Sequence, residues 1–248
     1  MDGFAGRTAM VTGGTRGIGA AITEMLAYAG AHVAAGYSRS RDHAEDLRDS
    51  LRDRGCSVSI HQGNVGDPDD CIRVVDEVME ERGGIDYLVN NAGVTVDKTV
   101  RKMSIDDWHA VLRVNLSGAF YMTKAVLDHM VDRGSGRIVN ISSVIGETGN
   151  IGQANYAASK SGLFGFSKSL GLEMAKKGIT VNCVAPGFID TDMVADVPSH
   201  ILDNVIATIP VGRLGRPDEI ARAVCFLLHD DSGYITGSVL AVNGGLEM

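Results

Sequence analysis

A tyrosine and a lysine stand at positions 156 and 160, in the segment YAASK, where the residues between them are small. Residues four apart share a face of an α-helix, so Tyr156 and Lys160 are predicted to be neighbours. A phenol can give a proton to a carbonyl oxygen that gains negative charge as its carbon accepts a hydride. An ammonium about 4 Å away is expected to lower the pKa of Tyr156 well below its ordinary value of about 10. The pair therefore predicts a proton donor for carbonyl reduction.

Two other polar residues are candidates for the same site. Ser143 follows the apolar segment GRIVNIS, and its hydroxyl is suited to give the carbonyl oxygen a second hydrogen bond. Asn115 lies within the helical pattern WHAVLRVNLSGAFYMTKAV, where asparagine has a poor propensity. Taken one at a time, these residues have ordinary alternatives: a surface pair for Tyr156 and Lys160, and a cap at the end of a strand for Ser143.

A glycine-rich segment, TGGTRGIG, comes between the first apolar run and the first helical pattern. Glycines in this position let the backbone turn sharply and approach a pyrophosphate at the N-terminus of the following helix. The spacing is G-x-x-x-G-x-G and not GxGxxG, and a tight turn without a ligand is the alternative. The cofactor-binding candidates in this segment are Gly13, Thr15, Arg16, Gly17, Ile18 and Gly19.

The residues after the second apolar run indicate which dinucleotide fits. Enzymes that use NAD usually place an acidic residue there, on the ribose 2′-hydroxyl. Here the run ends with Tyr37, Ser38 and Arg39, and the first acidic residue, Asp42, comes later. Guanidinium groups of Arg16 and of Arg39 or Arg41 match the geometry of a 2′-phosphate, although solvated surface charges are the alternative. The pattern favours NADPH over NADH.

The elements that must position these residues alternate along the chain. Short runs rich in β-branched residues, such as RTAMVTG and AHVAAGY, are followed by longer amphipathic patterns, and this rhythm continues to VLAVNGG near the end. Nearly apolar strands between helices predict an α/β fold with a parallel sheet covered on both faces. We expect one domain over residues 1–248, with a substrate lid within residues 187–215.

Composition excludes several classes of protein. The chain has 23 Lys and Arg against 31 Asp and Glu, a net charge of −8, and no clustered basic run, so nucleic acid is not expected as a partner. No apolar run approaches the length of about 18 residues that a membrane span needs, and the start does not read as a signal peptide. The four scattered cysteines indicate no metal site and fit a reducing cytoplasm.

Taken together and in order, the motifs TGGTRGIG, NNAG, NISS, YAASK and PGFIDTDM resemble those of the short-chain dehydrogenase/reductase family. The resemblance covers almost the whole chain. It implies a single-domain, Rossmann-type, doubly wound parallel sheet of about seven strands, a nicotinamide cofactor, and a catalytic tetrad of Asn115, Ser143, Tyr156 and Lys160. It also assigns Lys160 to the nicotinamide ribose, and Asn115 to holding Lys160 through a water molecule.

The resemblance implies further cofactor contacts. Asn64 and Val65 would lie near the adenine. For the NNAG motif, the alternative is that Asn90 and Asn91 only brace the sheet. The remaining candidates are Asn91, Ala92 and Gly93 beside the adenosine half, and Pro186, Gly187, Ile189 and Thr191 at the nicotinamide carboxamide.

Within the family, the motifs are most similar to reductases of 3-oxoacyl thioesters, carried either by coenzyme A or by acyl carrier protein. Both carriers have a phosphopantetheine arm, so local positive charge is expected at the mouth of the site. The substrate-binding candidates are Asp97, Lys102, Asn150, Gln153 and Phe188, and the basic candidates at the mouth are Lys98, Arg101, Lys102 and Arg213.

Two alternatives stay open. One is an oxidoreductase acting on a sugar, a polyol or a steroid, and the other is a catalytically silent NADP-binding regulator. The resemblance also implies a homotetramer. The helix that carries Tyr156 has small residues at Ala157, Ser161 and Gly165, which would let another helix approach closely, although packing inside the chain is the alternative.

Overall fold

The computed structural model describes residues 3–191 and 199–247. Within them, all strand pairs are parallel and form one sheet of seven strands in the order β3-β2-β1-β4-β5-β6-β7. This confirms the predicted fold class. The strands are β1 (Thr8–Val11), β2 (His32–Tyr37), β3 (Val58–Gln62), β4 (Tyr87–Asn90), β5 (Gly136–Ile141), β6 (Ile179–Pro186) and β7 (Val239–Val242).

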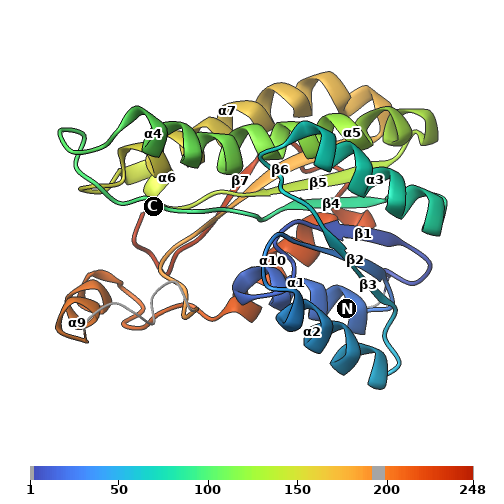
Figure 1. Ribbon diagram of the computed structural model, residues 1–248, viewed down its shortest axis with the longest axis horizontal. Coiled ribbons are helices and arrows are strands. Elements are labelled where there is room, and N and C mark those ends of the chain that lie inside the picture. Colours follow the sequence, from blue (N-terminus) through green and yellow to red (C-terminus); the bar gives the residue numbers. More distant parts are fainter. Residues whose placement is uncertain (1–2, 192–198, 248) are drawn as a thin grey trace.

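Helices cover both faces of the sheet (Figure 1). One face packs against α1 (Gly17–Tyr28), α2 (Arg41–Asp53) and α10 (Pro217–Leu228), and the other against α3 (Pro68–Arg82), α5 (Gly118–Arg133) and α7 (Ala154–Met174). Successive strand residues alternate between the two layers: Ala9 and Val11 lie in the first core and Met10 in the second. Both layers are apolar, which explains why the strands read as nearly continuous hydrophobic runs.

The chain order places the loops of the predicted site at one edge of the sheet. From β1 the chain crosses toward β3, and from β4 it crosses toward β7, so the two halves diverge between β1 and β4. In open parallel sheets a ligand binds at the carboxyl ends of the strands, where the order reverses in this way. The loops after β1, β4, β5 and β6, which contain the predicted motifs, all start at that edge.

The helix expected around Trp108 to Met130 is interrupted. It consists of α4 (Ile105–Leu112), a π-helix η1 (Arg113–Ser117) and α5. Ser104 caps α4, with its hydroxyl accepting a hydrogen bond from the Asp107 amide at 3.0 Å. The hydrophobic pattern continues through the π-helix, which is why periodicity did not detect it.

The expected lid, residues 187–215, lies partly outside the described residues, because 192–198 are not among them. The described part has more regular structure than predicted. Ile189 forms an isolated parallel bridge with Gly215, and α9 spans Ser199–Thr208. A short helix, α6 (Ile145–Thr148), also follows Ser143. Short 3-10 helices, η2 (Ala175–Lys177) and η3 (Asp230–Ser232), follow α7 and α10.

In the part of the chain that the structure describes, no helix is both long enough and apolar enough to cross a membrane.

Candidate active site

Ser143 and Tyr156 meet at the carboxyl edge of the sheet. Ser143 follows β5 and Tyr156 lies at the start of α7, and the Ser143 hydroxyl is close enough to the Tyr156 phenol to lower the pKa of Tyr156. The neighbouring Ser142 hydroxyl donates to the Lys160 carbonyl at 2.7 Å, which fixes the end of β5 against α7. The two hydroxyls predicted to bind one carbonyl oxygen are therefore adjacent.

Lys160 lies on the same helix face as Tyr156, as predicted, but it does not contact the phenol oxygen. Its Nζ is 5.6 Å from the centroid of the Tyr156 ring and donates to the Ile141 carbonyl at 2.7 Å. Burial raises the pKa of Tyr156, and the Ser143 hydroxyl opposes that shift only in part. The expectation that Lys160 lowers the pKa of Tyr156 was wrong. Burial disfavours the charged phenolate, and the Lys160 ammonium is directed at the Ile141 carbonyl and not at the phenol oxygen.

The ammonium of Lys160 is itself buried. The residue is 4% exposed, and burial lowers its pKa from 10.5 to about 8. Among the residues that the structure describes, no carboxylate contributes to this shift: the other cause is the Cys183 thiol, which acts in the opposite direction. A cation is thus held inside the protein with a backbone carbonyl as its nearest partner, an arrangement found at functional sites more often than elsewhere.

Asn115 lies in the π-helix, an irregularity that often occurs at functional sites. Its side chain exchanges hydrogen bonds with the backbone of Val94, at 2.8 and 3.0 Å, and donates to the Ser159 hydroxyl at 3.1 Å. A Cβ placed on Gly93 would be 3.5 Å from both Asn115 Oδ1 and Lys160 Nζ. The two atoms therefore flank one small space. That Asn115 holds Lys160 through water stays a prediction.

The glycine loop has the backbone that a phosphate cradle requires. Gly13 and Gly17 have φ angles of 59° and 52°, in the left-handed region. A Cβ on Gly19 would lie 2.0 Å from the Gly13 carbonyl oxygen, so no other residue fits there. The loop leads into α1, which has no acidic residue in its first turn and presents unpaired amides. Thr15 in this loop and Ile18 in the first turn of α1 are half-buried.

The NNAG motif braces the structure with both asparagines. Asn91 Nδ2 donates to the carbonyls of Thr12 and Gly13 at 3.0 and 3.1 Å, which holds the glycine loop. Asn90 Nδ2 bonds Asn140 Oδ1 at 2.8 Å, inside the sheet. The bracing alternative is therefore correct for Asn90. Asn91, with Ala92 and Gly93, lies beside the loop where a cofactor contact is predicted.

Two arginines near the glycine loop have no ion pair among the residues the structure describes. These are Arg16, the N-cap of α1, and Arg39, just after β2, and both are exposed. By contrast, Arg41 donates to Glu45 at 2.9 Å. Tyr37 is buried at the end of β2, and the Ser38 carbonyl accepts a hydrogen bond from Gln62 at 3.2 Å. The carboxyl edge of the sheet thus carries two guanidinium groups without an ion pair among the described residues. The residues directly after β2, where NAD enzymes usually have an acidic side chain, include no Asp or Glu.

The segment after β6 approaches the glycine loop. Pro186 ends the strand, and the Gly187 amide donates to the Val242 carbonyl at 3.0 Å. The Thr191 methyl carbon would be 3.4 Å from a Cβ on Gly17. Ile189 is buried between these points. The chain therefore runs from the end of β6 to the glycine loop, across the space where a dinucleotide is predicted.

Three of the predicted substrate residues form one hydrogen-bonded chain. Asn150 Nδ2 donates to Gln153 Oε1, and Gln153 Nε2 donates to Asp97 Oδ2, both at 2.9 Å. Phe188 lies apart from them, in a cavity lined also by Ile209 and Val242. The substrate role of all these residues stays a prediction.

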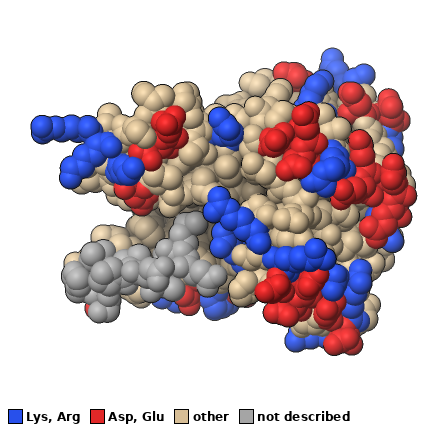
Figure 2. Space-filling view, viewed as in Figure 1, with Lys and Arg blue, Asp and Glu red and all other residues tan. Residues whose placement is uncertain are grey.

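Two of the basic candidates at the mouth are neutralised. Lys98 forms an ion pair with Asp107 and Arg213 one with Glu219, each at 2.7 Å. Arg101 and Lys102 are exposed and have no carboxylate partner within the described residues. Figure 2 shows Lys and Arg side chains around a hollow between the parts of the surface that carry α4 and α9. Of the four basic residues expected at the mouth of the site, only Arg101 and Lys102 thus remain without a carboxylate partner among the described residues.

Sequence reasoning missed Asn155. This residue is fully buried at the start of α7, where its Oδ1 accepts from the Tyr156 amide at 2.8 Å and its Nδ2 donates to the Val96 carbonyl at 3.1 Å. It joins the loop after β4 to the turn that carries Tyr156. The only signal in the sequence was its position next to the tyrosine.

The fold agrees with comparisons to known proteins. Residues 13–247 match the sequence model of a family described as Enoyl-(Acyl carrier protein) reductase. The chain belongs to the short-chain dehydrogenase/reductase family, whose members are oxidoreductases with a nicotinamide cofactor.

Among curated relatives, the chain is 48% identical over 240 residues to acetoacetyl-CoA reductase of Shinella zoogloeoides, covering 96% of this chain and 98% of the relative. It is 47% identical over 242 residues to acetoacetyl-CoA reductase of Cupriavidus necator, covering 98% of each. It is also 47% identical over 245 residues to 3-oxoacyl-[acyl-carrier-protein] reductase of Escherichia coli, covering 99% of each. The two activities are represented at equal similarity.

Burial of Lys160 predicts a pH-dependent cost in stability. Below pH about 8 the folded and unfolded chains both hold the proton, and the buried charge disfavours folding. Between about 8 and 10.5 the unfolded chain binds more protons, so this cost falls as pH rises. We expect Lys160→Met to be inactive but more stable than the wild type, by up to about 3 kcal/mol at pH 7. Urea unfolding from pH 7 to 10 should show this advantage shrinking.

Lys168→Met is the matched control, because Lys168 is exposed on the same helix. Its effect on the free energy of unfolding should be small. A constant difference between Lys160→Met and wild type over this pH range would contradict the assignment of a desolvated ammonium.

Proposed function

We propose that the protein reduces the 3-keto group of a 3-oxoacyl thioester with NADPH and forms the (R)-3-hydroxyacyl thioester. One observation carries the proposal: the paired hydroxyls of Ser143 and Tyr156, with the buried ammonium of Lys160 beside them, at the edge of the sheet where the glycine loop opens. Relatives with these two activities at 47–48% identity support the substrate class.

The chemistry follows from the state of these groups. NADPH, when bound, supplies the hydride. Ser143 and Tyr156 each donate a hydrogen bond to the carbonyl oxygen and so orient it and stabilise its growing negative charge. Because burial raises the pKa of Tyr156, the phenol holds its proton at neutral pH and can transfer it to the oxygen. The tyrosinate left behind must regain a proton before the next turnover, and the Lys160 ammonium, with its Nζ 5.6 Å from the Tyr156 ring centroid, is a proton source for it.

The substrate proposal is tested by the loss of NADPH absorbance with acetoacetyl-CoA and with acetoacetyl carrier protein at equal concentrations. We expect turnover with at least one, and the faster carrier identifies the physiological form. Tyr156→Phe should lower kcat by a factor of about 10³ or more, because no proton donor remains, while NADPH still binds. A fully active Tyr156→Phe protein would disprove the mechanism.

The same assay separates the alternatives. Crotonyl-CoA tests the reaction named by the description of the matched family. Turnover of a sugar, polyol or steroid panel, with none of the thioesters, would favour the first alternative. NADPH binding without any turnover would favour a silent regulator, which the presence of all four tetrad side chains argues against.

The preference for NADPH is proposed from Arg16 and Arg39. Arg39→Gln should weaken NADPH binding about tenfold and leave NADH binding unchanged, because only NADPH carries the 2′-phosphate. Arg41→Gln is the control, since Arg41 is already paired with Glu45. Both dissociation constants can be measured by fluorescence titration. Equal loss of both cofactors, or equal efficiency of the wild type with both, would contradict the preference.

We also propose a homotetramer, because apolar surface is exposed on two sides of the chain. On α5 and α7, Phe120 and Leu172 are 49% and 84% exposed, and a Cβ on Gly165 would meet nothing within 4 Å. On the other side, β7 is an edge strand and Tyr234 is fully exposed. Two separate apolar surfaces, each meeting its counterpart on a second copy of the chain, would suit a tetramer with dihedral symmetry.

Light scattering should give a mass four times the chain mass of 26.2 kDa. Phe120→Glu should reduce the assembly to dimers, because it places charge in one interface only. A monomeric wild type would contradict the proposal. The free thiols of the four cysteines support a cytoplasmic location, which cell fractionation would test.

A further inference from the structure

The turn after β3, residues 63–66, forms one wall of the crevice at the carboxyl edge of the sheet. The Gly63 amide donates to the Tyr37 carbonyl at 2.9 Å, so the turn lies beside the end of β2. Its other side packs closely against the start of α5, where a Cβ on Gly118 would lie 2.8 Å from the Val65 carbonyl oxygen. The adenosine half of the proposed cofactor must pass this turn.

The position of Asn64 in this turn depends on α3. The Asn64 amide donates to Asp70 Oδ2 at 2.9 Å, and Asn64 Oδ1 accepts from the Gly66 amide at 3.0 Å. Asp70, in the first turn of α3, therefore fixes the backbone of Asn64, and the Gly66 amide fixes its side chain. Arg73 and the Asn64 amide both lower the pKa of Asp70, which keeps this acceptor ionised.

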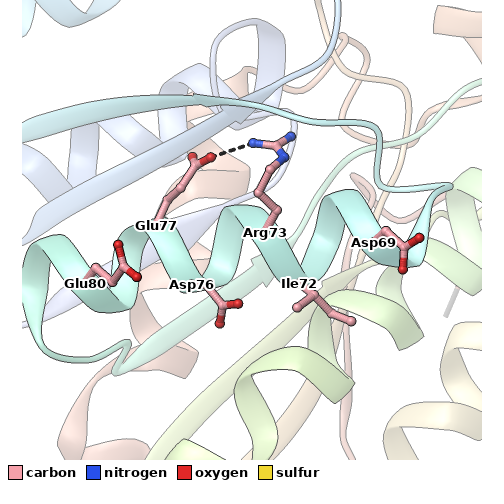
Figure 3. A pocket seen from close by; sticks show the side chains of 6 residues that line it. All are labelled: Asp69, Ile72, Arg73, Asp76, Glu77 and Glu80. Atoms are coloured by element: carbon pink, nitrogen blue, oxygen red, sulfur yellow. Dashed lines mark hydrogen bonds and ion pairs between the residues drawn. The ribbon is translucent and has the colours of Figure 1, made fainter.

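Arg73 joins Asp70 to the rest of the structure. Its guanidinium donates to Asp70 Oδ1 at 2.7 Å, to the Gln62 carbonyl at 2.8 Å and to Glu77 Oε1 at 2.6 Å. It thus ties the last residue of β3 to two carboxylates on α3. Figure 3 shows the Arg73 and Glu77 side chains directed toward each other along α3, with Asp76 pointing away from them.

Glu77 is held in turn by a row of side chains in which His61, Ser59 and His32 are buried. Its Oε2 is 3.1 Å from His61 Nδ1, and His61 Nε2 is 2.9 Å from the Ser59 hydroxyl. The row continues from Ser59 to His32 Nε2 at 3.0 Å and from His32 Nδ1 to Ser57 at 2.8 Å. These contacts join β2, β3 and α3.

One hydrogen bond in the row has a fixed direction. A carboxylate only accepts, so His61 donates from Nδ1 to Glu77. Burial lowers the pKa of His32, at the far end of the row, to about 4, so this histidine carries no charge at neutral pH.

We propose that Arg73 is a positioning residue for cofactor binding, acting through Asp70 on Asn64, with Glu77 and His61 as its fixed support. The proposal rests on the proposed function, because it takes the crevice beside residues 63–66 as the place of the adenosine half. Arg73 itself touches no part of the cofactor. Its removal frees Asp70, and the turn loses its fixed orientation toward the adenine.

A purely structural role would give a different result. Exposed ion pairs contribute little to stability, and the Arg73 side chain is 47% exposed. Loss of Arg73 should therefore change the melting temperature slightly. It should raise KM for NADPH about fivefold and leave kcat within about twofold, because Ser143, Tyr156 and Lys160 are unaffected.

The experiment compares Arg73→Gln, Arg73→Lys and the control Asp76→Asn, which changes an exposed carboxylate on the same helix without an ion pair among the described residues. Dissociation constants are measured for NADPH and for adenosine 2′,5′-bisphosphate. Arg73→Gln should weaken both ligands about fivefold, Arg73→Lys should recover part of the loss, and Asp76→Asn should match the wild type. Glu77→Gln is a second variant, with the same expected direction, if Arg73→Gln does not fold.

Unchanged binding of the bisphosphate by Arg73→Gln and Glu77→Gln would overturn the inference, as would an equal loss in Asp76→Asn. Failure of the proposed function is a separate result, because these measurements need no thioester substrate. A wild type that binds NADPH but reduces no thioester would remove the substrate proposal and leave this inference intact. A wild type that does not bind the bisphosphate would remove both.

Discussion

The buried ammonium of Lys160 is the constraint on which the site depends. A cation without a carboxylate partner is costly inside a protein, so the surrounding structure must hold it by other means. The Ile141 carbonyl accepts its hydrogen bond, and the Ser142 hydroxyl ties the Lys160 backbone to the end of β5. The strand end that carries Ser143 and the helix that carries Tyr156 are thereby held by the same lysine. The contacts that hold the buried charge are therefore the same contacts that position Ser143 and Tyr156.

Buried amides supply much of the remaining support. Asn115 joins the loop after β4 to α7 through Ser159, Asn155 joins the same loop to Tyr156, and Asn91 holds the glycine loop. Each of these side chains satisfies backbone groups that the loops would otherwise leave unpaired. Loops that approach ligands closely cannot form regular structure, so side-chain amides take the place of a neighbouring strand. The polar interior at this edge of the sheet follows from that need.

Alternating apolar runs and amphipathic patterns were enough to predict the parallel sheet, and the spacing of Tyr156 and Lys160 placed both on one helix face. Spacing along a helix does not determine where the end of a long, flexible side chain lies. For this reason the predicted lowering of the Tyr156 pKa by Lys160 was wrong. The ion pairs of Lys98 and Arg213 also depend on how separate turns pack. The segment SVSIH has a visible two-residue period, but its partners on β2 and α3 depend on sheet register and on packing.

The π-helix between α4 and α5 also makes the length of this segment critical. A π-turn accommodates one residue more than an α-helical turn does. Loss of a single residue other than Asn115 from 113–117 would allow a continuous α-helix and would turn Asn115 by about 100° relative to one of its flanking helices. The amide could then no longer reach both Val94 and Ser159. Substitutions in this stretch can preserve the fold, whereas a one-residue deletion changes which face of the helix meets the site.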